Sequence, residues 1–219
     1  MLCMLLGCVL GLGPAPRALA CEVALLLAID VSGSVDAGEY RLQLDGLSGA
    51  LRQEDVRAAI LEGRAALAVM QWSGRGQQRL AIGWRQPSNG AEITALALDV
   101  GIMARAFTAS DTAVGEAIDA ALAAFETAPS CTRRIIDISG DGPNNAGPLP
   151  AAARARAIAA GVEINAIAIE DTGRGLPITQ FYRNRVITPG GFVVTARTFE
   201  DYLRAMREKL LRELVRPTA

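Results

Sequence analysis

The chain has 219 residues, of which 51% are hydrophobic and 21% charged, which is enough for one well-buried domain and too few for two large ones. Its formal net charge of −1, without a long run of Lys or Arg, argues against nucleic acid as a partner, because phosphate backbones are bound through clustered positive charge. The sequence contains no histidine, and this excludes histidine-ligated zinc sites and the Ser-His-Asp and Cys-His catalytic arrangements.

The first 20 residues are typical of a secretory signal peptide. An apolar run is followed by Ala18-Leu19-Ala20, which has the small-x-small form of a cleavage site. A lipoprotein signal is the alternative, but Ala18 stands where a lipobox has leucine before Cys21. We therefore expect a signal peptide at residues 1–20, a mature domain at 21–219, and a periplasmic or secreted location. No later segment approaches the roughly 20 apolar residues of a membrane-spanning helix.

Strand-like apolar runs alternate with helical patterns along the rest of the chain, which is typical of a parallel sheet covered on both faces. Residues 22–29 (EVALLLAI) show no alternation and are predicted to form a central strand buried on both sides. Asp36 and Glu39 have the spacing of a helix N-cap and its N3 partner. They precede apolar residues at helical spacing: Tyr40, Leu44, Leu47 and Leu51.

Two short strand patterns at 65–72 and 79–84 are joined by a turn, which predicts a hairpin with one antiparallel strand at the sheet edge. Residues 171–191, punctuated by Gly and Pro, are expected to form a surface excursion with at most one helical turn. Further strands are expected at 133–139, 162–169 and 192–195, and further helices near 91–105, 113–126, 150–160 and 198–214. The last helix carries an apolar stripe: Phe199, Leu203, Met206, Leu210 and Leu214. The predicted fold is a three-layer, doubly wound α/β domain with a mostly parallel, six-stranded sheet and one antiparallel edge strand.

Three oxygen-bearing side chains stand at alternate positions at the end of the first strand: Asp30, Ser32 and Ser34. Alternate residues of an extended segment point the same way, so these three can converge on one point. That point lies outside the carboxyl ends of the strands, where open α/β sheets bind ligands. The alternative is that Asp30 caps the turn and the serines satisfy backbone groups at the start of the helix.

The Asp-x-Ser-x-Ser spacing resembles the metal-ion-dependent adhesion site (MIDAS) of von Willebrand factor A domains, which adds a threonine and an aspartate from two further loops. Thr112, in DTAVGEAI, and Asp141, in ISGDG, match these positions in the expected order. The runs DVSGSVDAGEY and SGDGPNN most resemble a bacterial, exported von Willebrand A-like family classed as domain of unknown function family 1194. Gly140 departs from the pattern, because many relatives have Ser or Thr directly before the aspartate.

The resemblance implies a metal site in which Ser32, Ser34 and Thr112 supply hydroxyl oxygens directly, while Asp30 and Asp141 bind directly or through water. Oxygen-only ligation suits Mg²⁺, with Mn²⁺ or Ca²⁺ as alternatives, and is unsuited to zinc or copper. Two carboxylates roughly neutralise the ion. Because the hydroxyls are neutral, the metal would stay electrophilic enough to take a carboxylate from a partner protein.

The same residues argue against catalysis, because no His, Lys or unpaired Glu is clearly placed to deprotonate a metal-bound water. We therefore expect an exported, metal-dependent protein-binding domain of the adhesion type and not an enzyme. Two alternatives remain: a metal-dependent phosphohydrolase, although such enzymes usually have a second aspartate where this chain has Ser32, and a structural module whose metal site engages no ligand. The oligomeric state is not predicted.

Other polar residues are expected near the same end of the sheet. Candidates for a ligand rim are Glu116, Asn144, Asn145, Glu170 and Asp171. For Glu116 the alternative is a favourable charge at a helix N-terminus, and for the asparagines it is ordinary turn chemistry. Trp72 and Trp84 are interpreted as core or edge cover.

The chain has four cysteines, two of them within the expected signal peptide. Cleavage after residue 20 removes Cys3 and Cys8 and leaves Cys21 and Cys131 in an oxidising compartment, either as one disulfide or as two buried thiols. Cys21 and Cys131 begin strands that end in the two proposed carboxylates, with similar offsets. If these strands are parallel neighbours, as in the family resembled, the two cysteines meet, and we therefore predict the disulfide.

Overall fold

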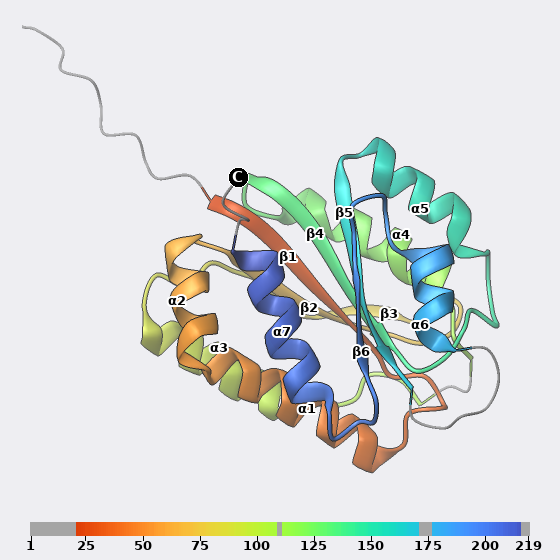
Figure 1. Ribbon diagram of the computed structural model, residues 1–219, viewed down its shortest axis with the longest axis horizontal. Coiled ribbons are helices and arrows are strands. Elements are labelled where there is room, and N and C mark those ends of the chain that lie inside the picture. Colours follow the sequence, from red (N-terminus) through yellow and green to blue (C-terminus); the bar gives the residue numbers. More distant parts are fainter. Residues whose placement is uncertain (1–20, 109–110, 171–176, 216–219) are drawn as a thin grey trace, which may run out of the picture.

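The computed structural model describes residues 21–108, 111–170 and 177–215 and contains one six-stranded sheet (Figure 1). The strands are ordered β3-β2-β1-β4-β5-β6, and every neighbouring pair is parallel except β2 and β3. Their bounds are β1 Cys21–Asp30, β2 Ala66–Trp72, β3 Gln78–Arg85, β4 Cys131–Gly140, β5 Val162–Ile169 and β6 Val193–Ala196. The fold class predicted from the sequence is confirmed, whereas the predicted signal peptide lies outside the described residues.

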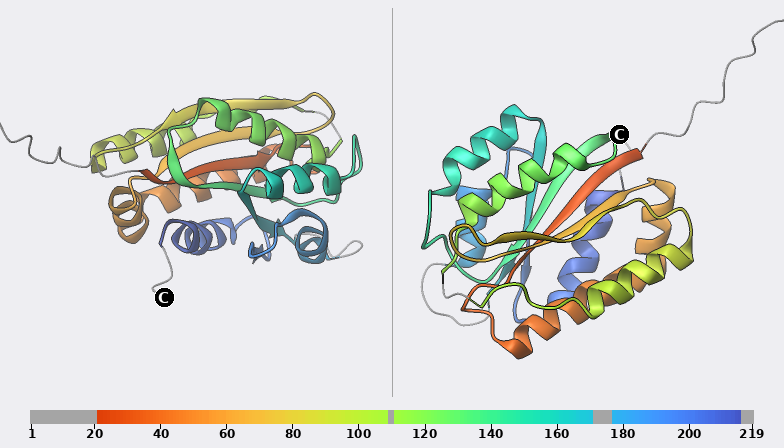
Figure 2. Two further views of the ribbon diagram at one scale, coloured as in Figure 1. Left: turned by 90° about the horizontal axis from the view of Figure 1, so that it is seen from above. Right: turned by 180° about the vertical axis from the view of Figure 1, so that it is seen from behind.

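Helices cover both faces of the sheet, as the opposite placement of α4 and α7 in Figure 2 shows. One face carries α1 Ala37–Arg52, α2 Glu54–Glu62, α3 Gly90–Gly101 and α7 Tyr202–Leu214. The other carries α4 Val114–Ala124, continued by a 3-10 turn at Phe125–Thr127, then α5 Pro150–Ala159, α6 Ile178–Phe181 and a π-helical segment at Tyr182–Val186. No helix within the described ranges is long and apolar enough to cross a membrane.

Strand β1 lies at the centre of the sheet and supplies both hydrophobic cores. Leu25 and Leu27 point into the core under α1 and α7, and Leu26 and Ala28 point into the core under α4 and α5. Because every second side chain of a strand faces the same side, a strand buried on both sides needs apolar residues at every position. This explains the uninterrupted apolar run and places the end of β1 rigidly in the middle of the sheet edge.

The N-terminus of α1 is fixed by the capping box expected from the sequence. The Glu39 backbone N–H donates to Asp36 Oδ1 at 2.8 Å, and the Asp36 N–H donates to Glu39 Oε2 at 2.6 Å. Such caps contribute about 1 kcal/mol to a helix. The cap residue Asp36 lies two residues after Ser34, so it also holds the loop between β1 and α1.

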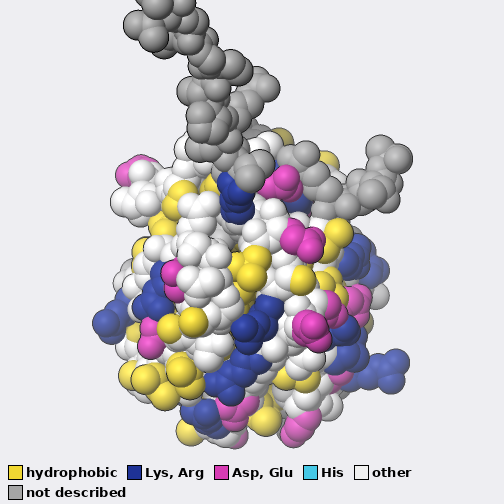
Figure 3. Space-filling model, turned by 90° about the vertical axis from the view of Figure 1, so that its left-hand side faces the viewer, with side chains coloured by type: hydrophobic (Ala, Val, Ile, Leu, Met, Phe, Trp, Pro, Cys, Tyr) yellow, Lys and Arg dark blue, Asp and Glu magenta, His cyan; other side chains and the backbone are white. Residues whose placement is uncertain are grey.

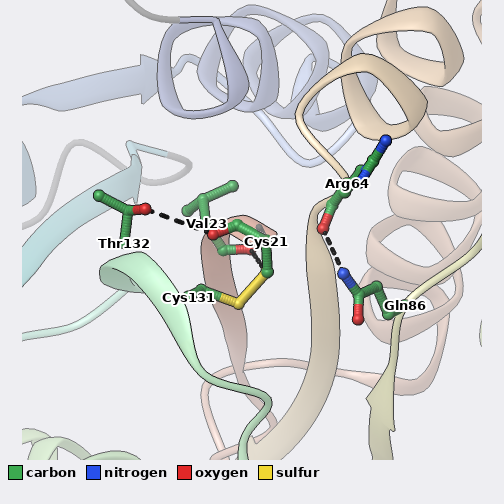
Figure 4. The surroundings of a disulfide bond; sticks show 6 residues. All are labelled: Cys21, Val23, Arg64, Gln86, Cys131 and Thr132. Atoms are coloured by element: carbon green, nitrogen blue, oxygen red, sulfur yellow. Dashed lines mark hydrogen bonds between the residues drawn. A yellow bond between two sulfur atoms is a disulfide. The ribbon is translucent and has the colours of Figure 1, made fainter. Parts of the chain in front are cut away.

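A disulfide joins Cys21 and Cys131, which are paired in register on β1 and β4 with their Cα atoms 4.5 Å apart. Figure 4 shows the bond at the ends of the two strands, with the Thr132 hydroxyl donating to the Cys21 carbonyl. The predicted disulfide is confirmed.

Figure 3, which faces the left-hand side of Figure 1, shows acidic and basic side chains intermingled among the described residues of that face.

A buried group of charges lies between α7 and the sheet, and we call it the α7 charge cluster: Lys209, Asp137 and Glu213. All three are at most 1% exposed, and Lys209 Nζ lies 2.8 Å from Asp137 Oδ1 and also contacts Glu213. Burial raises the pKa of Glu213 to about 8; attraction to Lys209 opposes this shift and repulsion from Asp137 adds to it. One cation therefore balances two carboxyl groups inside the core.

Several sequence expectations were wrong in detail. Helix α2 was missed, because it follows α1 after a single extended residue, Gln53. The helix expected over 91–105 ends at Gly101, and the one expected from 198 begins at Tyr202. Leu203 is 39% exposed and does not belong to the buried stripe of α7.

The largest correction concerns the expected surface excursion at 171–191. Residues 171–176 lie outside the described residues, but 178–186 are helical. Tyr182 and Val186 are fully buried against the sheet in the core under α4 and α5. This segment is therefore part of the core, because its apolar residues at i and i+4 turn toward β5 while the arginines between them face outward.

Candidate metal centre

Three chain segments meet at the carboxyl end of β1 and β4. The register pairs Ile29 with Ser139, so Asp30 lies beside Gly140, and Asp141 follows directly after the strand. Thr112 lies in the loop before α4. The next residue, Ala113, donates its backbone N–H to the Ser73 carbonyl at 2.9 Å. Adjacent parallel strands thus bring the two aspartates together, and a backbone hydrogen bond to the end of β2 brings in the threonine.

The hydroxyls and carboxylates form one continuous chain of contacts. Thr112 Oγ1 donates to Ser32 Oγ at 3.3 Å, and Ser32 Oγ lies 3.1 Å from Ser34 Oγ. Ser34 Oγ donates to Asp141 Oδ1 at 2.7 Å, and the Ser32 backbone N–H donates to Asp30 Oδ1 at 2.7 Å. The structure therefore brings together all five residues that the sequence selected from three separate segments.

The cluster is buried at its base and open at its rim. Asp30 and Ser32 are 0% exposed and Thr112 is 3% exposed, whereas Ser34 is exposed and Asp141 is half-buried. An ion held here would face protein oxygens on one side and solvent on the side of Ser34 and Asp141. This leaves room for a ligand from outside the chain.

The electrostatics of the cluster favour a cation. Burial raises the pKa of Asp30 to about 7, and repulsion from Asp141 adds to the shift, while the Ser32 N–H and Arg105 partly offset it. Asp30 Oδ2 is buried and has no hydrogen-bond partner among the described residues. An unpaired buried carboxylate is costly, and a divalent cation would relieve both the burial and the repulsion. Hydroxyl and carboxylate oxygens are the ligands that hard divalent cations accept, so the residues present fit such an ion.

The donor set depends on hydroxyl groups. Within the described ranges, no group of three or more Asp, Glu or Cys side chains is arranged to hold a metal ion. The site has two carboxylates and three hydroxyls. Acidic side chains alone therefore do not mark this candidate site, whereas the Asp-x-Ser-x-Ser spacing does.

Arg105 holds the loop between β1 and α1 and was missed by the sequence analysis. Its guanidinium donates to the carbonyls of Val31 at 2.9 Å and Ser32 at 2.8 Å. The expected helix over 91–105 would have included Arg105, but α3 ends earlier and the following loop returns to the site. No local pattern announces this contact, because it joins segments more than 70 residues apart.

The two asparagines predicted for the ligand rim accept hydrogen bonds from backbone N–H groups near the start of α4. Asn145 Oδ1 accepts from the Thr112 N–H at 2.7 Å, and Asn144 Oδ1 accepts from the Gly115 N–H at 3.1 Å. Both asparagines thereby fasten the loop after β4 to the start of α4.

The acidic candidates for the rim are also engaged within the protein. Glu116 turns toward the β2–β3 turn, where it accepts from the Gly76 N–H at 2.7 Å and lies 3.7 Å from Arg75. Glu170 accepts from the Thr179 N–H at 2.8 Å. Asp171 lies outside the described residues.

The tryptophans take structural positions, as interpreted from the sequence. Trp72 is fully buried at the end of β2. Trp84 is half-buried and its ring packs on Phe125, with the ring centroids 5.2 Å apart. Its indole N–H donates to the Ala124 carbonyl at 2.9 Å.

Gly140 and Tyr182 meet beneath the two aspartates. A Cβ atom on Gly140 would lie 2.3 Å from the Tyr182 hydroxyl oxygen and 2.9 Å from Asp30 Oδ2. The Ser or Thr of many relatives therefore does not fit here without displacing a neighbour. Burial, followed by the charges of Asp30 and Asp141, raises the pKa of Tyr182 well above its usual value, so the side chain remains a neutral hydroxyl.

The fold is shared with von Willebrand factor A domains of known structure. The chain is similar to proximal thread matrix protein 1 from the mussel byssus (20% identity, TM-score 0.64, covering 89% of this chain and 49% of that one). It is also similar to a von Willebrand factor type A protein from Catenulispora acidiphila (19%, 0.65, 89% and 43%). A third similar structure is the pilus adhesin SpaC from Lactobacillus rhamnosus GG in its open conformation (12%, 0.65, 88% and 30%).

A further structure of the mussel protein has a zinc-occupied MIDAS motif (19%, 0.65, 89% and 48%). The chain spans half or less of the length of these structures. No curated protein matches the chain. The family described as "Protein of unknown function (DUF1194)" matches residues 20–218, so this chain belongs to that family and has the fold of a von Willebrand factor A domain.

Proposed function

We propose that the chain is an exported, metal-dependent protein-binding domain that holds one divalent cation with Asp30, Ser32, Ser34, Thr112 and Asp141. The observation that carries the proposal is the convergence of these five oxygen-bearing side chains from three segments, with a buried carboxylate oxygen left unpaired among the described residues. Mg²⁺ is the first candidate, with Mn²⁺ and Ca²⁺ as alternatives. The zinc-occupied motif of the mussel protein adds Zn²⁺ to the ions to be tested and weakens our sequence-based argument against zinc.

The ligand set supports binding of an acidic partner. Two carboxylates balance the charge of the ion, and three neutral hydroxyls leave it able to accept another negative group. The open side, next to Ser34 and Asp141, is where a carboxylate of a partner protein would reach the ion. The similarity to a pilus adhesin is in keeping with such a role.

The surroundings of the site favour binding over hydrolysis. Glu116, an acidic side chain predicted for the ligand rim, is held by the Gly76 N–H and lies close to Arg75. Lys209 is buried in the α7 charge cluster. Hydrolysis needs a base within reach of a metal-bound water, and neither group is free for that task. A phosphohydrolase with Mg²⁺ remains the enzymatic alternative, and a metal site without a partner remains the structural one.

The proposed periplasmic or secreted location has one structural support. The disulfide between Cys21 and Cys131 is a bond that persists in oxidising compartments and is rare in the cytosol. It lies directly after the expected cleavage site. Sequencing the N-terminus of the protein recovered from outside the cytoplasm should begin at Cys21.

Two experiments test the proposal. The first is calorimetric titration of the EDTA-treated protein with Mg²⁺, Mn²⁺, Ca²⁺ and Zn²⁺. Asp141→Asn and Thr112→Val are the site variants, and Asp45→Asn, on the exposed face of α1, is the matched control. Removing a ligand should weaken binding by more than the roughly 10–100-fold typical of outer residues, whereas the control should bind like wild type.

The second experiment is capture of envelope proteins on immobilised wild type and Asp141→Asn, with metal and with EDTA. A partner should bind the wild type only with metal, and esterification of its carboxyl groups should abolish binding. A partner that binds equally in EDTA, to a folded domain, contradicts the proposed function. Phosphate-ester hydrolysis that requires Mg²⁺ and Asp30 would favour the enzymatic alternative instead.

A further inference from the structure

Two buried polar atoms beneath the proposed metal site have no hydrogen-bond partner among the described residues: the Tyr182 hydroxyl and Asp30 Oδ2. Both residues are 0% exposed. Both atoms also approach the same point, the position of a Cβ atom on Gly140, at 2.3 Å and 2.9 Å. Buried polar groups in folded proteins are nearly always paired, so two unpaired atoms around one point call for an explanation.

The residue at position 140 suggests an explanation for these unpaired atoms, because Gly140 stands where many von Willebrand A relatives have a hydroxyl residue. The absence of a side chain at 140 opens the space that the Tyr182 hydroxyl occupies. Tyr182 comes from a different part of the chain, the segment that follows α6, and it begins a π-helical stretch. Such stretches are rare and are frequent at functional sites.

We propose that Tyr182 is a positioning residue of the metal centre: its hydroxyl takes the place of a Ser or Thr side chain at 140 and, in the metal-bound protein, donates to Asp30 Oδ2, a hydrogen bond that the two atoms do not form in this structure. This inference rests on the proposed metal site and extends it. Hydrogen bonds from outer residues orient carboxylate ligands and tune the affinity for the ion. Tyr182 would hold Asp30 from below while the Ser32 N–H holds its other oxygen at 2.7 Å.

A purely structural tyrosine would behave differently. Its ring already packs in the core under α4 and α5, and a buried hydroxyl without a partner disfavours folding. In that case Tyr182→Phe would keep or improve stability and leave metal affinity unchanged. If the hydroxyl positions Asp30, the same substitution lowers metal affinity although the core remains filled.

The test is calorimetric titration with Mg²⁺ and Mn²⁺ of wild type, Tyr182→Phe and Tyr202→Phe. Tyr202 is a matched control, because it is also fully buried and its hydroxyl donates to Ser139 Oγ at 3.0 Å on the face under α7. We expect Tyr182→Phe to weaken binding about 10–100-fold with an unchanged circular dichroism spectrum, and Tyr202→Phe to bind like wild type. Equal affinities of Tyr182→Phe and wild type overturn this inference alone, whereas a wild type that binds no ion overturns the proposed function as well.

The steric part is tested without metal. Gly140→Ala should lower the urea midpoint of the wild type in EDTA, and it should lower that of Tyr182→Phe by less, because the hydroxyl that would collide with the new Cβ is gone. Coupling between substitutions in contact is measured by such a double-mutant cycle. Equal midpoint shifts in the two backgrounds would show that Tyr182 does not occupy the space at 140 and would overturn the proposal.

Discussion

The disulfide between Cys21 and Cys131 should supply a large part of the domain's free energy of unfolding. Replacing both Cys21 and Cys131 by serine removes a bond between residues 110 positions apart. On the chain-entropy model, closing a loop of about 100 residues stabilises the folded state by about 4.7 kcal/mol at 25 °C. Since single domains are stable by only about 5–15 kcal/mol, the doubly substituted domain should lose a large part of its free energy of unfolding.

Urea unfolding, followed by circular dichroism and tryptophan fluorescence, measures this loss. The oxidised wild type, the wild type reduced with dithiothreitol and the double serine variant are compared in EDTA, so that metal binding does not shift the curves. The reduced protein and the variant should both be less stable by about 4–5 kcal/mol. A loss below about 1 kcal/mol in both would contradict the chain-entropy estimate for this loop.

Three further predictions concern buried polar groups. Lys209→Met should destabilise the domain by about 3–5 kcal/mol in urea unfolding, because it leaves the two buried carboxyl groups of the α7 charge cluster without their cationic partner; a loss within error of zero would contradict this. Asn145→Ala should weaken Mg²⁺ binding about tenfold in calorimetry, since its side chain holds the Thr112 backbone; an unchanged affinity would show that the loop needs no such support. Because the folded-state pKa of Asp30 is raised to about 7, its protonated form favours folding, and in EDTA its contribution should fall by about 2–3 kcal/mol between pH 5 and pH 8. Asp30→Asn should remove that part of the pH dependence of unfolding, and identical slopes for variant and wild type would refute it.

The parts of the fold that the sequence predicted are those governed by local spacing. The continuous apolar run of β1 predicted a strand buried on both sides, and the spacing of Asp36 and Glu39 predicted the start of α1. Three of the candidate metal ligands could be predicted for the same reason, because Asp30, Ser32 and Ser34 belong to one short segment. Their partners Thr112 and Asp141 required the resemblance to a known family.

The parts that were missed depend on contacts between distant segments. Residues 178–186 contain polar and charged positions that resemble a loop, and only their packing against β5 shows that Tyr182 belongs to the core. Arg105 reaches the site because α3 ends at Gly101, a stop signal that the prediction of a helix over 91–105 did not take into account. Gly140 departs from the family pattern, and its contact with Tyr182, from a segment more than 40 residues away, does not follow from local spacing.

The central claim is that five side chains from three segments hold one divalent cation, and a crystal structure of the Mn²⁺-soaked protein tests it most directly. We expect one anomalous peak among the oxygens of Asp30, Ser32, Ser34, Thr112 and Asp141, and no peak there in Asp141→Asn crystals soaked in the same way. A well-ordered site without a peak at saturating Mn²⁺, or a peak bound by other residues, would contradict the claim.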